Sequence, residues 1–167
     1  MPSDDSAPPI ELRRAATAAE LAQAAQLFRE YAASLDVDLC FQGFDAEVAS
    51  LPGAYAAPSG RLLLAFVGGE LAGSAALRAL VAAGHDNACE MKRLYVRPAF
   101  RRYGLGRTLA AALLDEARRA GYACMLLDTL DAMEAARRLY TSLGFKAIAP
   151  YYANPIAGVH YLKADLT

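Results

Sequence analysis

The chain has 167 residues, 56% of them hydrophobic, and a formal net charge of −1 with an isoelectric point near 6.1. This length predicts one domain with a buried core, and the near-neutral charge excludes a global attraction to nucleic acid or anionic lipid. Because Cys40, Cys89 and Cys124 are widely separated and the chain has neither CxxC nor HxxxH spacing, we expect reduced thiols and no bound metal.

The N-terminal residues 1–9, MPSDDSAPP, are polar and proline-rich, so we expect a disordered arm before one domain over residues 10–167. A signal peptide would be basic and then apolar, and no later run approaches the ~18 apolar residues of a membrane span. The sequence therefore predicts a cytoplasmic protein without membrane contact.

Hydrophobic periodicity and turn residues predict a succession of strands and helices. Thr17 followed three residues later by Glu20 forms a capping box at a helix start, and Gly68-Gly69 between two apolar runs predicts a hairpin. The order β-α-α-β-β-β-α-β-α-β-β indicates an α/β (α+β) fold, a mixed sheet with helices on its faces. The expected elements are a strand at 10–15, helices at 18–35 and 45–51, strands at 61–67, 70–80 and 89–96, a helix at 104–120, a strand at 123–128, a helix at 133–143 and strands at 145–149 and 158–166.

The expected strand at 89–96, CEMKRLYV, has polar side chains on both alternating faces. Such a strand is either covered on both sides or turns part of one face towards a ligand cleft. Glu90 and Leu94 are four residues apart, so strict alternation predicts that both lie on one side of the sheet.

The stretch RRYGLG, residues 101–106, lies between this strand and the longest amphipathic pattern of the second half. A helix start presents unpaired backbone N–H groups, which attract anions, and Gly104 and Gly106 would keep them accessible. Arg101 and Arg102 add positive charge, so the stretch predicts a phosphate or pyrophosphate site. The alternative is a glycine cap with solvated arginines. Spacing excludes a P-loop, which needs GK[ST], and a dinucleotide fingerprint, whose third glycine position is Leu109.

The segment LYVRPAFRRYGLGRTLAAALLDEARRAGY, followed by LYTSLGF, resembles the GNAT superfamily of acyl-CoA-dependent N-acetyltransferases. The resemblance is strong over residues 88–146 and rests elsewhere on the order of elements. It implies a single-domain fold with a mixed, mostly antiparallel sheet of about 6–7 strands and about four helices on its two faces. It also implies acetyl-CoA as co-substrate and a small-molecule or peptide amine as acceptor.

The resemblance further implies which residues bind acetyl-CoA. In the family, the strand-to-helix loop binds the pyrophosphate through its backbone amides, and the preceding strand pairs its backbone with the pantetheine arm. A neighbouring amide commonly polarises the thioester carbonyl. The implied residues are Leu94, Tyr95 and Val96 along the arm, and Arg101, Arg102, Tyr103, Gly104, Leu105, Gly106 and Arg107 at the pyrophosphate.

Tyr140, in LYTSLGF, matches the family's tyrosine that protonates the departing CoA thiolate. A phenol with a pKa of about 10 stays protonated at neutral pH and can donate to a thiolate. The alternative is a core tyrosine, because Tyr140 shares a helix face with apolar residues. Many family members carry an asparagine seven residues earlier; Met133 stands here, so we expect no polar side-chain contact from that helix start.

The amine must lose a proton, and Glu90 is the leading candidate base, directly or through water. A structural ion pair between Glu90 and Lys92, Arg93 or another cation is the alternative. Weaker candidates for holding a cationic substrate are Asp128, Asp36 and Asp38.

The sequence thus predicts direct acetyl transfer from acetyl-CoA to an amine, without a covalent cysteine intermediate. The alternative is a non-catalytic acyl-CoA-binding or regulatory module, which the presence of both Glu90 and Tyr140 disfavours. Transfer of an acyl group longer than acetyl is a further alternative. Acceptor specificity is expected from residues 36–44 and from PYYANPIAGVHYL, whose tyrosines and Asn154 either line a pocket or only close the sheet. A homodimer is a further expectation from the family.

Overall fold

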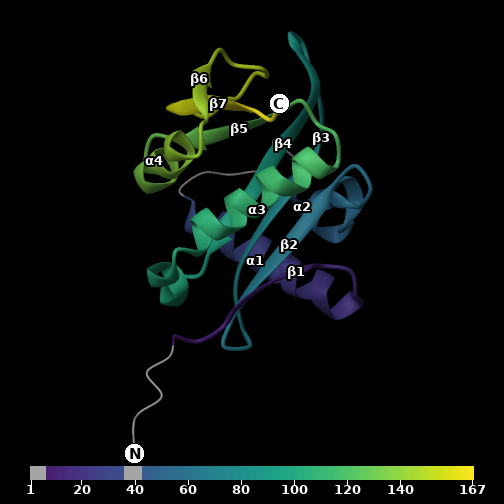
Figure 1. Ribbon diagram of the computed structural model, residues 1–167, viewed down its shortest axis with the longest axis vertical. Coiled ribbons are helices and arrows are strands. Elements are labelled where there is room, and N and C mark those ends of the chain that lie inside the picture. Colours follow the sequence, from purple (N-terminus) through teal and green to yellow (C-terminus); the bar gives the residue numbers. More distant parts are fainter. Residues whose placement is uncertain (1–6, 36–42) are drawn as a thin grey trace, which may run out of the picture.

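The computed structural model describes residues 7–35 and 43–167, which form one seven-stranded sheet in the order β1-β2-β3-β4-β5-β7-β6 (Figure 1). All neighbouring strands are antiparallel except β4 and β5, which are parallel. The α+β fold with a mixed, mostly antiparallel sheet is therefore confirmed. The strands are β1 (Ile10–Arg14), β2 (Arg61–Val67), β3 (Glu70–Ala82), β4 (His85–Val96), β5 (Cys124–Leu130), β6 (Lys146–Ile148) and β7 (Val159–Asp165).

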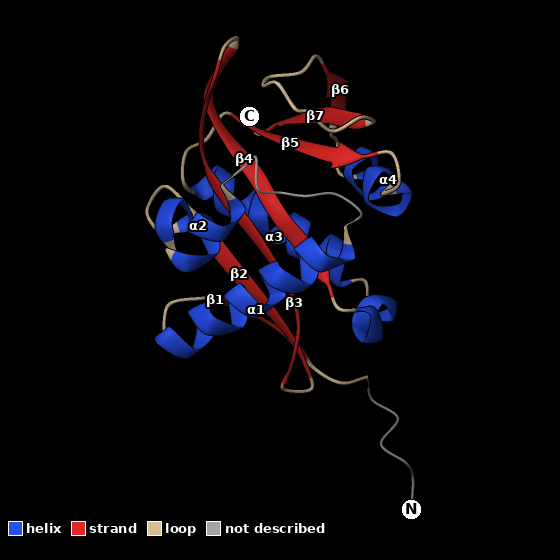
Figure 2. Ribbon diagram, turned by 180° about the vertical axis from the view of Figure 1, so that it is seen from behind, coloured by secondary structure: helices blue, strands red, loops and turns tan. Residues whose placement is uncertain are grey.

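Helices cover both faces of this sheet. Helix α3 crosses one face, and α1 and α2 lie on the other (Figures 1 and 2). The helices are α1 (Ala18–Ser34), α2 (Phe44–Ala49), α3 (Leu105–Arg119) and α4 (Glu134–Ser142), with short 3-10 turns η2 (Gly53–Tyr55) and η3 (Pro98–Tyr103).

Each face of the sheet buries an apolar cluster, as expected for a sheet between two helical layers. On the α3 face, Leu109 and Leu113 pack with Met125 and Leu127 of β5. The opposite cluster joins Phe28 of α1 to side chains of α2 and β2. Helices therefore cover both faces of the sheet. A ligand can reach buried groups of the strands only where two neighbouring strands separate.

Two local sequence signals are confirmed. The Thr17 hydroxyl accepts a hydrogen bond from the Glu20 amide at 3.1 Å, and the Glu20 carboxylate accepts one from the Thr17 amide at 3.0 Å, which completes the capping box. Gly68 and Gly69 have positive φ angles of 57° and 83°, which suit the tight turn between β2 and β3.

The hairpin of β3 and β4 is longer than the sequence predicts. The register pairs Ala82 with His85, so β4 begins four residues before the expected start at Cys89. The segment 85–88 is polar at its start, so a hydrophobic pattern alone does not predict it as strand. The hairpin extends past the neighbouring strands (Figure 1).

A β-bulge interrupts the pairing of β3 and β4. Ser74 pairs with Tyr95 and Ala76 with Lys92. A step of two residues on β3 therefore lies opposite a step of three residues on β4, so β4 contains one extra residue. Arg93, inside the bulge, has a φ angle of 60°. Leu94 consequently packs in the α3-side cluster, on the face opposite to Glu90. The predicted common side of Glu90 and Leu94 is therefore wrong, because the inserted residue reverses the alternation.

Some sequence predictions fall outside the described residues: those for Asp36, Asp38, Cys40 and the first six residues. Of the expected N-terminal arm, residues 7–9 are described, and the Pro9 carbonyl accepts a hydrogen bond from the Gly68 amide at 2.9 Å. Within the described ranges, no helix combines the length and hydrophobicity needed to cross a bilayer.

Candidate active site

The parallel strands β4 and β5 pair over only three positions, from Ala88 with Cys124 to Glu90 with Leu126. Beyond this point β4 continues to Val96 and β5 to Leu130 without pairing with each other, although β4 stays paired with β3 and β5 with β7 (Figure 1). A pocket occupies this opening. It is lined by Tyr31, Leu35, Met91, Lys92, Arg93, Leu94, Leu127, Asp128, Thr129, Leu130, Met133, Tyr140, Asn154 and Ile156.

The start of α3 has the predicted form of an anion site. Gly104 is the N-cap residue with a φ of 67°, a left-handed conformation that glycine adopts without strain. The Thr108 amide donates to the Gly104 carbonyl at 3.2 Å, so the amides of residues 105–107 precede the first helical hydrogen bond. A Cβ at Gly106 would contact Leu139 at 3.5 Å, an ordinary distance. Gly104 is thus required by conformation, whereas Gly106 leaves the first turn uncovered.

Three exposed arginines surround this helix start. Arg101 donates to the Val96 carbonyl at 3.1 Å, and the Arg107 guanidinium donates to the Ser142 hydroxyl at 2.7 Å. The Arg102 guanidinium lies over the Tyr103 ring, 4.8 Å from its centroid. Their positive charges add to the partial positive charge of the helix end, which favours an anionic ligand.

Two of the predicted acetyl-CoA residues, Tyr95 and Leu105, have buried side chains, so they would contribute mainly backbone groups. The side chain of Leu105 is fully buried in the α3-side core. That of Tyr95 lies on the opposite face, where its hydroxyl donates to Glu30 at 3.4 Å. Leu94 and Val96 are partly buried against the α3-side cluster. Contact through backbone groups fits the role that the sequence resemblance implies for this segment.

Tyr140, on α4, is both a buried core residue and part of the pocket lining. Its side chain is only 5% exposed and lies edge-on to Phe145, with ring centroids 5.6 Å apart, yet it also lines the pocket between β4 and β5. Burial raises the pKa of the Tyr140 phenol above its usual value, and the negative charge of Asp128 contributes in the same direction. Tyr140 therefore stays protonated at neutral pH and can act as a proton donor.

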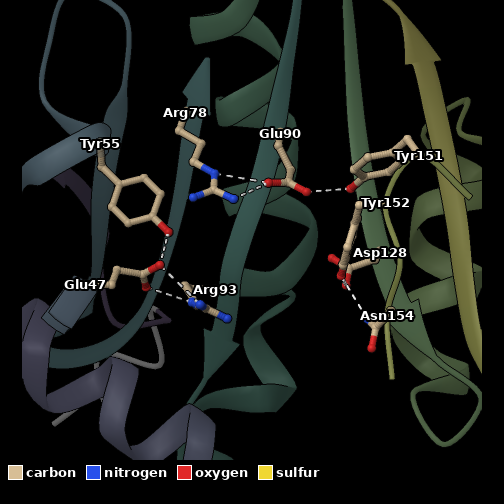
Figure 3. Close-up of polar contacts among 9 residues, drawn as sticks. All are labelled: Glu47, Tyr55, Arg78, Glu90, Arg93, Asp128, Tyr151, Tyr152 and Asn154. Carbon is tan, nitrogen blue, oxygen red and sulfur yellow. Dashed lines mark hydrogen bonds and ion pairs between the residues drawn. The ribbon is translucent and has the colours of Figure 1, made fainter. Parts of the chain in front are cut away.

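Glu90 lies in an ion pair, which is the alternative that the sequence left open. It is 2% exposed and accepts hydrogen bonds from Arg78 at 2.9 and 3.1 Å and from the Tyr151 hydroxyl at 2.5 Å (Figure 3). Together with Lys92 and Tyr152, Glu90 lines a second pocket, next to the one that contains Tyr140. The structure does not bring Glu90 and Tyr140 into the same pocket.

A second buried ion pair holds the bulge. Arg93 donates to Glu47 of α2 at 2.9 and 3.1 Å, and Glu47 also accepts from the Tyr55 hydroxyl at 2.9 Å (Figure 3). The Arg93 guanidinium lies 5.1 Å from the centroid of the Phe44 ring. These contacts explain how a non-glycine residue keeps a positive φ here. They also join α2 to the strand that forms one wall of the pocket.

Asp128, two residues before the end of β5, lies in the pocket with Tyr140. It accepts a hydrogen bond from the Tyr152 hydroxyl, which in turn accepts one from Asn154 at 2.8 Å (Figure 3). The Asn154 side-chain oxygen accepts from the Ile156 amide at 2.9 Å. Tyr151, Tyr152 and Asn154 of the C-terminal segment therefore line pockets, whereas Tyr161 lies within strand β7.

Sequence reasoning did not assign Lys92 or Tyr31 to the site. Lys92 is 7% exposed and lines both pockets, and burial lowers the pKa of its ammonium group. The polar side chains on both faces of CEMKRLYV were the only available signal for Lys92. Tyr31 lies on the buried face of α1, where its spacing resembles that of any core residue.

Metal ligands are not gathered in the described part of the chain. Among residues 7–35 and 43–167, no group of three or more His, Cys, Asp or Glu side chains has the arrangement of a metal site. Cys89 and Cys124 are buried, and burial raises the pKa of the Cys89 thiol to about 12. A thiol with this pKa is a poor nucleophile at neutral pH.

Residues 21–145 match the model of the Acetyltransferase (GNAT) family. The chain belongs to this family. It is an acetyl-CoA-dependent N-acetyltransferase. An uncharacterized N-acetyltransferase of Schizosaccharomyces pombe is 40% identical over 142 residues, which cover 84% of this chain and 85% of the relative.

Solved structures share the fold of this N-acetyltransferase. An acetyltransferase from Streptococcus agalactiae superimposes with a TM-score of 0.75 at 22% identity, covering 93% of this chain and 98% of that one. The Salmonella typhimurium acetyltransferase yncA, solved with its cofactor acetyl-CoA, has a TM-score of 0.68 at 24% identity, covering 95% and 94%. Structures at these identities support the fold alone.

Proposed function

We propose that this N-acetyltransferase transfers the acetyl group directly from acetyl-CoA to a primary amine of a small molecule or peptide. The observation that carries the proposal is the single pocket in the β4–β5 opening, which contains both Tyr140 and Asp128. A thioester and an amine that meet there would have a proton donor and a carboxylate within one enclosed space.

Acetyl-CoA would bind along the α3 end of this opening. The amides of residues 105–107 and the arginines at 101, 102 and 107 would bind the pyrophosphate. Because β4 stops pairing with β5 at Glu90, backbone groups of Leu94–Val96 are free of strand pairing on that edge and would bind the pantetheine arm. One of these amides would stabilise the charge that develops on the thioester oxygen.

In the transfer step, the amine nitrogen attacks the thioester carbonyl carbon, so a C–N bond forms and the C–S bond breaks. The thiolate of CoA takes a proton from the Tyr140 hydroxyl, which is later restored from solvent. The proton lost by the amine passes to water beside Asp128. Glu90 is not part of this step, since its carboxylate is engaged by Arg78 and Tyr151.

The experiment measures CoA release and acetylated product with a panel of amino acids, peptides, polyamines and aminoglycosides, together with acetyl-CoA binding by calorimetry. We expect binding and transfer to at least one class of amine. Tight binding without transfer to any amine would instead support a non-catalytic acyl-CoA-binding module. Comparing acetyl-CoA with longer acyl-CoAs tests the preference for acetyl.

Three features of the proposal concern the whole protein. We propose that residues 10–167 act as one domain, that the enzyme works in the cytoplasm, and that it forms a homodimer. Sedimentation velocity of the full chain measures the oligomeric state, and fractionation of the source cells measures the compartment.

A further inference from the structure

We infer that Tyr152 is a positioning residue, whose hydroxyl holds the carboxylate of Asp128 in the orientation that binds the amine of the acceptor. This inference rests on the proposed function, since Asp128 is the carboxylate beside which the amine would lose its proton. It gives the segment after β6, which carries Tyr152, a task in the reaction (Figure 3).

A chain of hydrogen bonds with one direction ends at Asp128. The Ile156 amide donates to Asn154 Oδ1 at 2.9 Å. The Asn154 nitrogen then donates to the Tyr152 hydroxyl at 2.8 Å, and this hydroxyl donates to Asp128 Oδ2 (Figure 3). Because a backbone N–H can only donate, it determines which end of the Asn154 amide faces the tyrosine. The chain therefore presents a donor to Asp128, which suits an ionised carboxylate.

The position of Tyr152 is itself fixed by the strand next to Asp128. Tyr161 of β7 pairs with Asp128 in the β5–β7 register, and its hydroxyl donates to the Tyr152 carbonyl at 3.2 Å. The rings of Tyr152 and Tyr161 meet edge-on, with centroids 5.6 Å apart, and Tyr151 packs against both rings. The hydrogen-bond donor of Asp128 is thus held by the pair of strands that carries Asp128.

Asp128 lies where the sheet opens, and its orientation matters there. It is two residues beyond the last β4–β5 pair, and it lines the pocket that contains Tyr140. A carboxylate at an opening can adopt several rotamers. A hydrogen bond to Oδ2 limits this freedom before the acceptor binds, so less entropy is lost on binding. Oδ1 would then bind the ammonium of the acceptor, or the water that takes its proton.

A tyrosine can orient the carboxylate without adding a charge. Lys92 lines the same pocket and is attracted by both Asp128 and Glu90. A further cation bound to Asp128 would compete with the ammonium of the acceptor. The Tyr152 phenol stays neutral instead, because burial and the hydrogen bond to Asp128 raise its pKa.

Tyr151 provides the matched control for Tyr152. It belongs to the same group of three tyrosine rings, and its hydroxyl also donates to a carboxylate, that of Glu90, at 2.5 Å. Glu90, however, lines the neighbouring pocket and takes no part in the proposed step. If the two hydroxyls only held this segment against the sheet, removing either one would have a similar effect.

The first test compares Tyr152→Phe with Tyr151→Phe, using the best acceptor of the amine panel. Tyr152→Phe should raise KM for the acceptor by about 3- to 10-fold, less than the loss of a hydrogen bond to a charged group, because the carboxylate itself remains. Its kcat should stay within about threefold and its KM for acetyl-CoA within about twofold of wild type. Tyr151→Phe should leave both KM values within about twofold.

The second test asks whether Tyr152 acts through Asp128. In a double-mutant cycle, Tyr152→Phe should change KM for the acceptor by less than about twofold when Asp128→Asn is already present, since no charged carboxylate remains to be oriented. Asn154→Leu removes the donor to the Tyr152 hydroxyl at similar side-chain size. It should show a smaller rise in KM for the acceptor and the same dependence on Asp128. Thermal unfolding and acetyl-CoA calorimetry report whether each variant is folded.

The outcomes separate this inference from the proposed function. Equal acceptor KM values for Tyr152→Phe and Tyr151→Phe would overturn the inference and leave acetyl transfer standing. An effect of Tyr152→Phe that persists in full with Asp128→Asn would also overturn it, because the tyrosine would then act on the acceptor directly. If Tyr152→Phe does not fold, Asn154→Leu with and without Asp128→Asn decides. Failure of the wild-type protein to acetylate any amine would contradict the proposed function, and the inference with it.

Discussion

The two ends of the β4–β5 opening are built in different ways. The end next to α3 consists of backbone amides, glycines and exposed arginines from one continuous stretch, residues 94–107. The opposite end consists of buried and partly buried side chains from α1, β4, β5 and the segment after β6. A ligand common to a whole family can be bound by backbone geometry, whereas an acceptor particular to one protein needs side chains that can differ.

If this division is correct, substitutions at one end should leave the ligand of the other end bound normally. Tyr140, between the two ends, should affect neither binding step but only the chemistry.

Tyr140→Phe should have the largest effect, lowering kcat by about 10²- to 10⁴-fold, the usual range for a general acid. The phenyl ring keeps the packing against Phe145, so acetyl-CoA affinity should change little. Steady-state kinetics and calorimetry measure the two quantities. Tyr122→Phe is the matched control, because its hydroxyl donates to the Ser59 carbonyl outside the pocket. An unchanged kcat in Tyr140→Phe would rule out its role as acid.

Gly104→Asp should weaken acetyl-CoA binding by at least about 100-fold, since a negative charge at the helix N-terminus repels the pyrophosphate. Gly104→Asn separates charge from shape, because asparagine also tolerates the left-handed conformation and has almost the same size. We expect calorimetry to show a much smaller loss for Gly104→Asn. Equal affinities for both variants would mean that the phosphates bind elsewhere.

Asp128→Asn should raise KM for the acceptor by about 10- to 100-fold, the cost of losing one hydrogen bond to a charged group. The amide side chain still accepts the Tyr152 hydrogen bond, so the loop should keep its position. Because Asp128 belongs to the acceptor end, KM for acetyl-CoA should stay within about twofold of the wild-type value. A large rise in KM for acetyl-CoA instead would show that the two ends are not independent.

Glu90→Gln should have the smallest catalytic effect, with kcat within about threefold of wild type and an unchanged pH–rate profile. Its effect should appear in stability, as a loss of about 1–2 kcal/mol in the free energy of unfolding, because the Arg78 guanidinium loses its anionic partner. Glu134→Gln, in an exposed ion pair of α4, should cost less than about 0.5 kcal/mol. A pH–rate profile that lost its acidic limb would restore Glu90 as the base.

The sequence was sufficient for the order of the elements and for the form of the α3 start, because these depend on neighbours along the chain. The capping box at Thr17 and the turn at Gly68-Gly69 are local hydrogen-bonding and φ requirements that residue types reveal directly. Gly104 is a further example, because its φ angle of 67° is a left-handed conformation that glycine adopts without strain.

The acceptor end could not be predicted from local patterns. The partner of Glu90 is Arg78, which reaches it only through the β3–β4 register, and Tyr151 follows it by 61 residues. The prediction that Glu90 and Leu94 lie on one side of the sheet was wrong because the hydrophobic pattern of the sequence does not reveal a one-residue bulge. Lys92 and Asp128 line one pocket because of how β4 is placed beside β5, which the sequence alone does not define.

The bulge at Arg93 also bears on how this enzyme could be redirected to other amines. In the proposed binding mode it separates β4 into a stretch whose side chains would face the acceptor and a stretch whose backbone would face acetyl-CoA, with the Arg93–Glu47 pair at the boundary. Libraries confined to positions 31, 92, 128 and 154 could therefore explore new acceptors without disturbing the thioester. For a designer, one extra residue in a strand turns a single structural element into two independently adjustable parts.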